Sequence, residues 1–539
     1  MRFLFAVVVH TGCQEEVANS PDIRFAPDTA TSVATLTADT GGTLDTPDSS
    51  GDTANVGETT GTVSTGETGQ ETASHTGTGA PVDTSLPVLI GPRFPALSVA
   101  EDIAIARITF DAGDFGDPDM TSRIGDLNGD GIADLVVDSD LSTPNDNGTY
   151  IFFGPVVGTF HREEADLFLQ WISNYPATES AGDVNGDGSS DLWIGDSAAT
   201  LLVHGPFEPG EAEVESVASA RWYQPDQTQG GQMHPSGVDS GRDVNGDGVL
   251  DVLLGDPSGN APDLVGAAWL LYGPLPDGDF RPVDIADSSW DGNEEEHWAL
   301  GLAVLLDLDG DGLADPAMGC YGHDVPLAYA SGALHLSLSP IPAGLQAGDS
   351  FDGNWLAETT CTEFTESLAR GGDLDGDGRE DLLLGCIDKY PEGDSPWNTY
   401  GAVYVVLGPG TGDHYADEAW WRVYGVEDAS PQGWGLTEAG DMDLDGHDDL
   451  FIGARAADTS GGVYLYYGPI KAGLYDPTAA DSVIFSDGGG ELGGGFGQGL
   501  TVPGDVTGDG FPDLLVSAPL YNQPGQNAGS VFLFDPTDF

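Results

Sequence analysis

The sequence has very little positive charge. Its 539 residues include 15 Lys and Arg, only two of them lysines, against 90 Asp and Glu, so the formal net charge is −75. A chain this acidic has no electrostatic means of holding a nucleic-acid backbone or an anionic membrane surface. The partners that remain are cations, and neutral surfaces recognised by loops.

The usual patterns of catalytic sites are also missing. The ten histidines form no H-x-x-x-H pair, and no G-x-S-x-G, P-loop or Cys/Cys/His zinc pattern occurs. The glycine-rich run 488–499 precedes an expected strand rather than a helix, so it does not predict a phosphate cradle. We therefore expect a protein that is not an enzyme, although carboxylate pairs are too numerous to exclude a hydrolase by counting.

Long apolar runs are absent from the N-terminus. Residues 3–9 are apolar, which is too few to span a bilayer but enough for the core of a signal peptide. Thr11-Gly12-Cys13 resembles a bacterial lipobox, except that His10 stands where that motif has an aliphatic residue. Residues 1–13 therefore predict export, either with a lipid anchor at Cys13 in the cell envelope or by secretion.

Residues 14–84 form a segment of different composition. They are rich in Thr, Asp, Glu and Gly, contain no Tyr, Trp or Lys, and show no apolar periodicity. Such a stretch cannot bury enough surface to offset its chain entropy. We expect a disordered acidic linker, followed by a folded domain over residues 85–539.

The pattern D-x-[DNT]-x-D-G-x-x-D occurs seven times in that domain, at intervals of 57 to 68 residues. Carboxylate and amide oxygens at positions 1, 3, 5 and 9 suit Ca²⁺, which takes six to eight oxygen ligands, and Gly at position 6 permits the sharp turn. The sequence predicts up to seven calcium ions, with loops four to six binding most tightly because position 3 is Asp there. The predicted ligands, loop by loop, are Asp126, Asn128, Asp130 and Asp134; Asp183, Asn185, Asp187 and Asp191; Asp243, Asn245, Asp247 and Asp251; Asp307, Asp309, Asp311 and Asp315; Asp373, Asp375, Asp377 and Asp381; Asp441, Asp443, Asp445 and Asp449; and Asp505, Thr507, Asp509 and Asp513.

Other readings of these loops fit less well. An EF-hand needs flanking helices and a Glu at position 12. Here short apolar runs such as 135–137 and 514–516 follow position 9, and runs of this length bounded by Gly, Asp or Pro are typical of buried strands. Loops without a metal would leave several carboxylates repelling one another.

The rest of each period predicts three further strands, one of them ending in Gly-Pro, as in 150–155 and 463–469. Four strands in each of seven repeats predict an all-β fold, a seven-bladed β-propeller of four-stranded blades. The last repeat lacks its outer strand, and the spare strand 103–110 precedes the first loop. We predict that residues 103–110 complete blade seven beside residues 531–534.

Short motifs around the loops carry a family resemblance. Phe496-Gly497 and Trp434-Gly435 precede loops, and Ser517-Ala518-Pro519 follows one. They resemble the FG-GAP repeat of integrin α-subunit heads, a family in which seven blades form a propeller with calcium loops. The resemblance covers residues 85–539 and implies cell-surface adhesion. It also implies that Cys361 lies on the same face as Cys386 and Cys320, so that a disulfide to either one, or three reduced cysteines, is expected.

Three hypotheses for the function follow. The first is an exported, monomeric, calcium-stabilised interaction module that presents loops to a protein or glycan partner, with residues 138–148, 223–239, 321–331 and 387–400 as candidate loops because their lengths vary. The alternatives are a carbohydrate-binding lectin and, less favoured by the scarcity of bases, a polysaccharide-acting enzyme.

Overall fold

The computed structural model describes residues 93–110, 124–139, 147–171, 177–195, 199–223, 237–256, 266–291, 300–320, 332–346, 350–362, 364–389, 400–425, 433, 435–455, 461–486, 493–519, 521 and 528–538. The segments expected to be a signal (1–13) and a linker (14–84) lie outside the described residues. So do most of the four candidate partner-binding loops.

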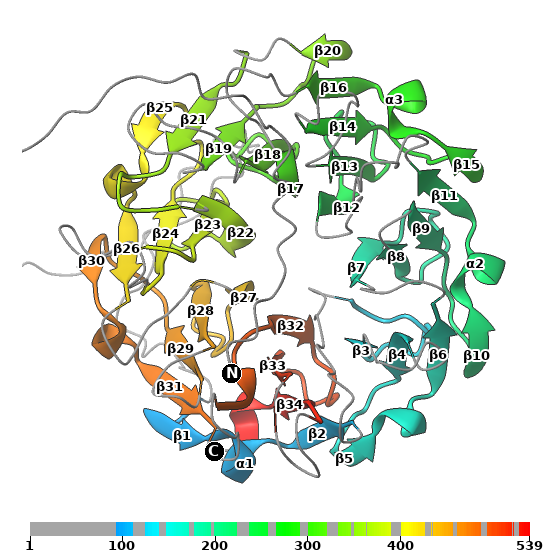
Figure 1. Cartoon of the computed structure of the whole chain (residues 1–539), viewed down its shortest axis with the longest axis vertical. Coiled ribbons are helices and arrows are strands. Elements are labelled where there is room, and N and C mark those ends of the chain that lie inside the picture. Colours follow the sequence, from blue (N-terminus) through cyan, green and yellow to red (C-terminus); the bar gives the residue numbers. More distant parts are fainter. Residues whose placement is uncertain are drawn as a thin grey trace, which may run out of the picture. The chain divides into compact units, whose positions relative to one another are not determined.

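The domain is a seven-bladed β-propeller, in which seven small sheets stand around a common axis (Figure 1). Blade one contains β3 (Leu135–Ser139), β4 (Gly148–Phe152), β6 (Leu167–Gln170) and β10 (Gly210–Glu213), and blade two contains β7 (Ala177–Gly182), β8 (Asp191–Gly195), β9 (Ala199–Val203), β11 (Ala220–Tyr223) and β15 (Gly278–Phe280). Blade three contains β12 (Val238–Arg242), β13 (Asp251–Asp256), β14 (Ala267–Leu271), β16 (Ser288–Asp291) and β20 (Gly344–Gln346). Blade four contains β17 (Leu300–Leu306), β18 (Asp315–Cys320), β19 (Ala333–Leu336), β21 (Gly353–Leu356) and β25 (Gly412–Tyr415).

The remaining three blades complete the ring. Blade five contains β22 (Phe364–Gly372), β23 (Asp381–Cys386), β24 (Ala402–Val406), β26 (Trp421–Tyr424) and β30 (Gly473–Tyr475). Blade six contains β27 (Leu436–Gly440), β28 (Asp449–Ala454), β29 (Gly462–Tyr466), β31 (Ser482–Phe485) and β1 (Leu97–Val99). Blade seven contains β32 (Leu500–Gly504), β33 (Asp513–Ala518), β34 (Ser530–Phe534), β2 (Ala106–Thr109) and β5 (Gly158–His161).

The second and third strands of each blade are the most deeply buried. Every residue of β13 and β14, for example, is buried, whereas the fourth strand β16 alternates buried and partly exposed residues. Continuous apolar runs are expected where both faces of a strand are covered, here by the two neighbouring blades. This is why the apolar run after each Asp loop predicted the second strand correctly.

Most blades have one strand more than the sequence predicted. After the third strand the chain leaves its own blade, adds a short parallel strand to the outer edge of the preceding blade, and returns to form the fourth strand. Thus β10, which follows β9 of blade two, pairs with β6 of blade one in parallel, with Gly210 opposite Leu167. Each such strand covers an edge that would otherwise expose unpaired backbone groups.

Short helices occupy the return path between the edge strand and the fourth strand. They are α1 (Ala100–Ile103), η1 (Arg162–Glu164), α2 (Val214–Val217), α3 (Pro282–Ile285), η4 (Ala416–Glu418) and η6 (Pro477–Ala479). Two further turns, η7 (Gly493–Gly495) and η8 (Pro536–Asp538), lie in blade seven and after it.

The predicted closure of the ring is confirmed. β2 pairs antiparallel with β34, with Ala106 opposite Leu533 and Thr109 opposite Ser530. Just before it, β1 pairs in parallel with β31 of blade six. Residues 93–110, here called the N-terminal strap, therefore join blade six to blade seven.

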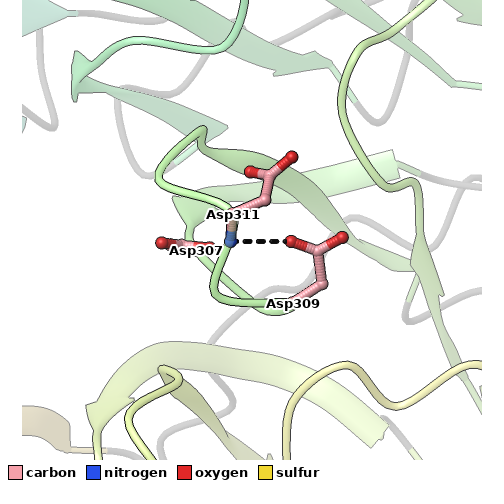
Figure 2. A group of neighbouring side chains, drawn as sticks. All are labelled: Asp307, Asp309 and Asp311. Carbon is pink, nitrogen blue, oxygen red and sulfur yellow. Dashed lines mark hydrogen bonds between the residues drawn. The ribbon is translucent and has the colours of Figure 1, made fainter. Parts of the chain in front are cut away.

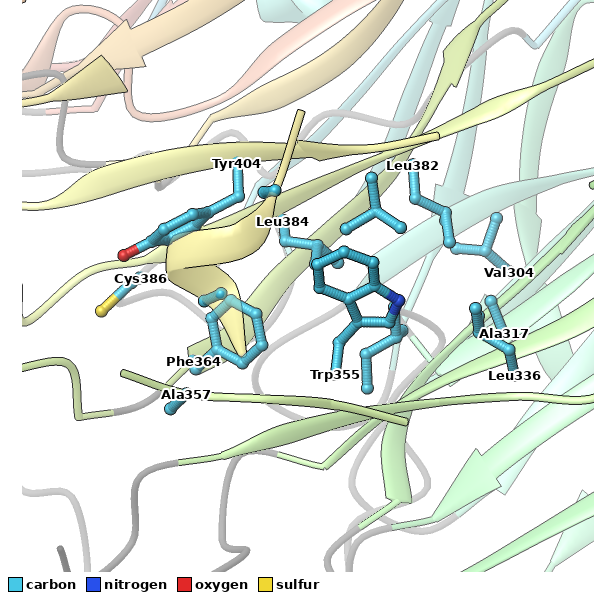
Figure 3. Packing of buried hydrophobic residues seen from close by; sticks show 14 of the residues in the cluster. Val304, Ala317, Leu336, Trp355, Ala357, Phe364, Leu382, Leu384, Cys386 and Tyr404 are labelled. Carbon is cyan, nitrogen blue, oxygen red and sulfur yellow. The ribbon is translucent and has the colours of Figure 1, made fainter. Parts of the chain in front are cut away.

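Apolar side chains fill the space between neighbouring blades. The cluster between blades four and five contains Trp355, Phe364 and Tyr404, with Val304 and Leu382 on the adjoining strands (Figure 3). At the rim of this cluster Cys361 forms a disulfide with Cys386. The bridge is one of the two pairings that the sequence left open, and Cys320 is buried in blade four.

Candidate metal centres

The Asp loops of blades two to seven connect the first and second strands of their blades. Loop one leads into β3 and is hydrogen-bonded to loop two through Ser190 N–H and Asp126 O (3.1 Å), so all seven loops lie on one face of the propeller. Within each loop the aspartates organise the backbone. In every loop the Gly N–H at position 6 donates to the carboxylate at position 1, over distances of 2.7–3.0 Å, such as the 2.7 Å between Gly131 N and Asp126 Oδ2. The N–H at position 7 likewise donates to the carboxylate at position 5. The backbone thus turns the side chains at positions 1 and 5 toward the middle of the loop.

Glycine is required at position 6 by this turn. The φ angles there lie between 82° and 98° in all seven loops, a region that L-residues with a side chain rarely adopt. Position 4 also has positive φ, and six loops place Gly there. The exception is Leu444 in loop six, with φ of 55°.

The position-9 aspartate has a different task from the others. It is buried in every loop, and its Oδ2 accepts the N–H of position 2, as between Leu308 and Asp315 (2.9 Å). In six blades its Oδ1 also accepts the N–H of the residue before a proline at the end of the third strand, as between Gly468 and Asp449 (2.7 Å). This carboxylate therefore fixes the loop to its own blade, and each oxygen keeps a lone pair for a cation.

Burial makes these carboxylates hard to ionise without a cation. Burial raises the pKa of position 9 despite the backbone hydrogen bonds, to about 6 for Asp134 and Asp251 and to about 7 for Asp315, Asp381 and Asp449. The strongest case is Asp513, whose pKa burial raises to about 8. Its Oδ1 is buried and finds no hydrogen-bond partner among the described residues.

In three loops the carboxylates converge most closely. One oxygen from each of three side chains lies within 4.8 Å of the other two in Asp307, Asp309 and Asp311 of loop four. The same holds for positions 1, 3 and 9 of loops five and six: Asp373, Asp375, Asp381, and Asp441, Asp443, Asp449. Figure 2 shows the loop-four group, in which Asp311 N–H donates to Asp309 Oδ1 (3.1 Å). These are the loops with Asp at position 3.

The other loops are polar but bring fewer charges together. In loops one and two the position-3 side chain is an amide, and Asn128 and Asn185 donate from Nδ2 to the carboxylate at position 5 (3.1 and 2.9 Å). In loop seven the hydroxyl of Thr507 points to Asp505, at 3.4 Å. The loops thus share one backbone scaffold and differ in the number of converging carboxylates.

Neighbouring loops are hydrogen-bonded to each other, which the motif alone did not reveal. Glu380 at position 8 of loop five donates its N–H to Asp307 O (3.0 Å) and accepts the N–H of Asp307 on its side chain (2.6 Å). Asp448 of loop six accepts the N–H of Asp373 in the same way (2.7 Å). The only hint in the sequence is an acidic residue at position 8 in two loops.

A polar cavity of about 360 Å³ lies among the inner strands β7, β12, β17, β22 and β27. The arginines that line it form ion pairs and hydrogen bonds with other blades. Arg370 on β22 reaches Asp239 on β12 (2.6 Å) and donates from Nε to Leu305 O on β17 (2.9 Å). Arg242 pairs with Glu380 (2.6 Å). These contacts bridge blades three, four and five.

Comparison with known proteins identifies the repeat. A family model described as "FG-GAP repeat" matches residues 496–534, the inner three strands of blade seven. Integrin alpha pat-2 of Caenorhabditis elegans is 28% identical over 260 residues, which cover 44% of this chain and 19% of that protein. Integrin alpha-PS3 of Drosophila melanogaster is 32% identical over 195 residues (35% and 15%), and integrin alpha-5 of Xenopus laevis 29% over 170 residues (31% and 15%). Blade seven thus matches an FG-GAP repeat, and the propeller is similar in sequence to part of the integrin α-subunits.

The contacts in blade seven explain the FG motif of this propeller. Phe496 is fully buried and its ring meets those of Phe532 and Phe534 edge-on, with centroids 5.7 and 6.3 Å apart. A Cβ on Gly497 would lie 2.5 Å from Gly462 O of blade six, so only glycine fits. The motif therefore packs one blade against the preceding one. The aligned part spans about a fifth of the length of the integrin subunits.

Proposed function

We propose that this propeller is a calcium-stabilised interaction module of the cell surface or extracellular space. The observation that carries the calcium assignment is the convergence of carboxylate oxygens within 4.8 Å in loops four, five and six. Carboxylates packed this closely repel one another, a bound cation would remove that repulsion, and a cage of carboxylate oxygens in a flexible loop suits Ca²⁺. The buried position-9 carboxylates support the same assignment because a bound cation would offset their cost of ionisation. Bound Ca²⁺ would be held by positions 1, 3, 5 and 9 of each loop and would supply charge neutralisation, with no catalytic part.

Export is supported by two observations. The disulfide between Cys361 and Cys386 is typical of oxidising compartments. The relatives are integrin α-subunits, and we carry their surface location over to this chain as part of the proposal. None of the helices in the described part of the chain is both long and apolar enough to cross a membrane. Lipidation at Cys13, secretion without an anchor, and a monomeric state are further parts of this proposal.

The partner is proposed to be a protein or glycan that contacts the face opposite the Asp loops. The ends of the second strands and the starts of the third strands lie on that face because the strands of each blade alternate in direction. The Asp loops occupy the other face and are held by their own hydrogen bonds. Binding rather than catalysis is therefore the proposed activity.

Calcium dependence is tested by thermal unfolding and metal analysis of the full chain. At about 1 mM free calcium and a dissociation constant of about 0.1 mM, each occupied loop contributes about 1.4 kcal/mol to stability. We expect five or six ions per chain at this concentration and a marked fall in melting temperature on chelation. A matched pair of variants sharpens this test. Asp375→Asn removes one converging carboxylate and should lose calcium, whereas Asp284→Asn, at an exposed side chain on α3, should not.

An unchanged melting curve in chelator would refute the calcium assignment. The partner is tested separately, with the full chain in calcium applied to a glycan array and to immobilised extracellular-matrix proteins. Binding to matrix proteins alone supports adhesion, binding to glycans alone supports the lectin alternative, and binding to neither refutes the proposed class of partner.

A further inference from the structure

Loop six departs from its six counterparts. Position 4 is Leu444 rather than Gly. Asp443 at position 3 is completely buried, whereas Asn185 at the same position of loop two is exposed. The loop nevertheless has aspartates at all four predicted ligand positions. Something other than solvent covers its carboxylates.

The cover is an arginine from the N-terminal strap. Arg93 donates from Nε to Asp443 Oδ2 and from Nη2 to Asp445 Oδ2, at 3.3 Å for the second bond. Its guanidinium lies over the ring of Tyr467, 4.4 Å from the centroid. The next residue, Phe94, is buried and donates its N–H to Tyr467 Oη (2.9 Å). A cation thus already contacts positions 3 and 5 of this loop.

The position of Arg93 follows from the propeller repeat. After the Gly-Pro corner that ends a third strand, the chain touches the Asp loop of the preceding blade, as where Phe207 N–H donates to Leu127 O (2.8 Å) and Val156 N–H to Val506 O (3.2 Å). In the strap, Arg93 contacts the Asp loop of blade six through its side chain, and in the sequence it follows Gly91-Pro92. The residues that follow the corner prolines elsewhere are not basic: Val156, Phe207, Leu275, Ile341, Gly410 and Ile470.

We propose that loop six holds the Arg93 guanidinium in place of a permanently bound ion, and that calcium competes with Arg93 for this loop. The inference rests on the proposed calcium binding of the other loops. Ca²⁺ would need the same oxygens of Asp443 and Asp445, and two cations cannot share them without strong repulsion. Loop six is therefore the weakest calcium site instead of one of the strongest. Calcium bound there would release Arg93 and loosen the strap that joins blades six and seven.

The test counts calcium on the full chain by equilibrium dialysis and metal analysis at about 1 mM free calcium, within the range of extracellular modules. Arg93→Gln should bind one more ion than the wild type. The affinity of loop six for calcium should be about tenfold higher in this variant than in the wild type, because Arg93 no longer competes for the loop. Arg107→Gln is the matched control. Arg107 lies in the same strap, but its guanidinium packs over Tyr521, 4.4 Å from the ring centroid. Adding Asp441→Asn to Arg93→Gln should remove the extra ion.

Each outcome separates this inference from the calcium proposal. Equal calcium counts and affinities in the wild type and Arg93→Gln would overturn the competition while leaving calcium binding intact. No calcium on any variant would refute the calcium proposal itself. If Arg93→Gln does not fold, Arg93→Lys serves as the second variant. Lysine keeps the positive charge but lacks the planar set of N–H donors that contacts both carboxylates, so loop six of this variant should bind calcium more tightly than loop six of the wild type. No gain in that variant would overturn the inference.

Discussion

A buried aspartate away from the loops gives a sharp prediction about pH. Asp138 on β3 is 1% exposed and joins blade one to blade two. Its Oδ1 accepts hydrogen bonds from the hydroxyls of Thr149 (2.7 Å) and Thr178 (2.8 Å), and its Oδ2 accepts the N–H of Thr178 (2.7 Å). Burial nevertheless raises its pKa to about 6, because three hydrogen bonds only partly offset the loss of hydration.

The sign of the pH effect follows from linkage. The folded state holds the proton of Asp138 up to about pH 6, whereas the unfolded chain loses it near pH 4, so the folded state binds more protons in between. Stability from this group is therefore fully present below about pH 4 and is lost as the pH rises to about 6. The pKa of Asp138 differs by about two pH units between the folded and unfolded states, which corresponds to about 3 kcal/mol in the free energy of unfolding.

Asp138→Asn removes the titration and keeps the contacts. An amide oxygen can accept the N–H of Thr178, and its NH₂ can donate to the two hydroxyl oxygens. We expect the free energy of unfolding of the variant, relative to the wild type, to rise by about 3 kcal/mol between pH 4 and pH 7. Denaturant unfolding of both proteins at each pH in excess calcium measures it, because effects of the loop carboxylates cancel in the difference. A difference that stays constant across this range would refute the assignment of the shift to Asp138.

Two further predictions concern the links between blades. Arg370→Ala should destabilise the protein by about 3 kcal/mol, because it leaves the partly buried Asp239 without its cation, whereas Arg281→Ala, in an exposed pair 3.7 Å apart, should cost under about 1 kcal/mol; equal losses in denaturant unfolding would contradict this. Reducing the bridge between Cys361 and Cys386, which are 25 residues apart, should cost about 3 kcal/mol in the same assay, and an unchanged transition midpoint with reductant would show that the bridge does not constrain the unfolded chain.

The sequence was sufficient to predict the features that the Asp-loop repeat marks. Seven copies of one loop set the number of blades, the apolar run after each loop located a buried strand, and the leftover strand at 103–110 predicted the closure with β34. The edge strands were not predictable in this way. β5 has no buried residue and β10 none either, so neither shows the alternation or the apolar run that marks a strand. Their pairing is set by where the neighbouring blade lies.

The close approach between blades was also hidden from the sequence. Gly453 reads as an ordinary glycine in a strand, yet a Cβ there would lie 2.1 Å from Gly497 O of blade seven. Arg93 is separated from Asp443 by 350 residues, and a single arginine beside two prolines carries no signal for a loop that far away. Contacts of this kind depend on how neighbouring blades pack against each other, which no local pattern encodes.

Loops six and seven are unusual for one common reason. In the other six blades the corner after the third strand gives an N–H to the position-9 aspartate of its own blade. In blades one and two the residue after the corner proline also donates its N–H to the Asp loop of the preceding blade. For blade seven these two contacts would come from two segments that lie far apart in the sequence. Asp535-Pro536 follows its third strand and leaves Asp513 Oδ1 without a partner among the described residues, while the strap brings Arg93 to loop six. One loop thus has an unsatisfied carboxylate oxygen and the next already has a cation, so calcium should contribute most to stability at loop seven and least at loop six, the reverse of what counting aspartates predicts.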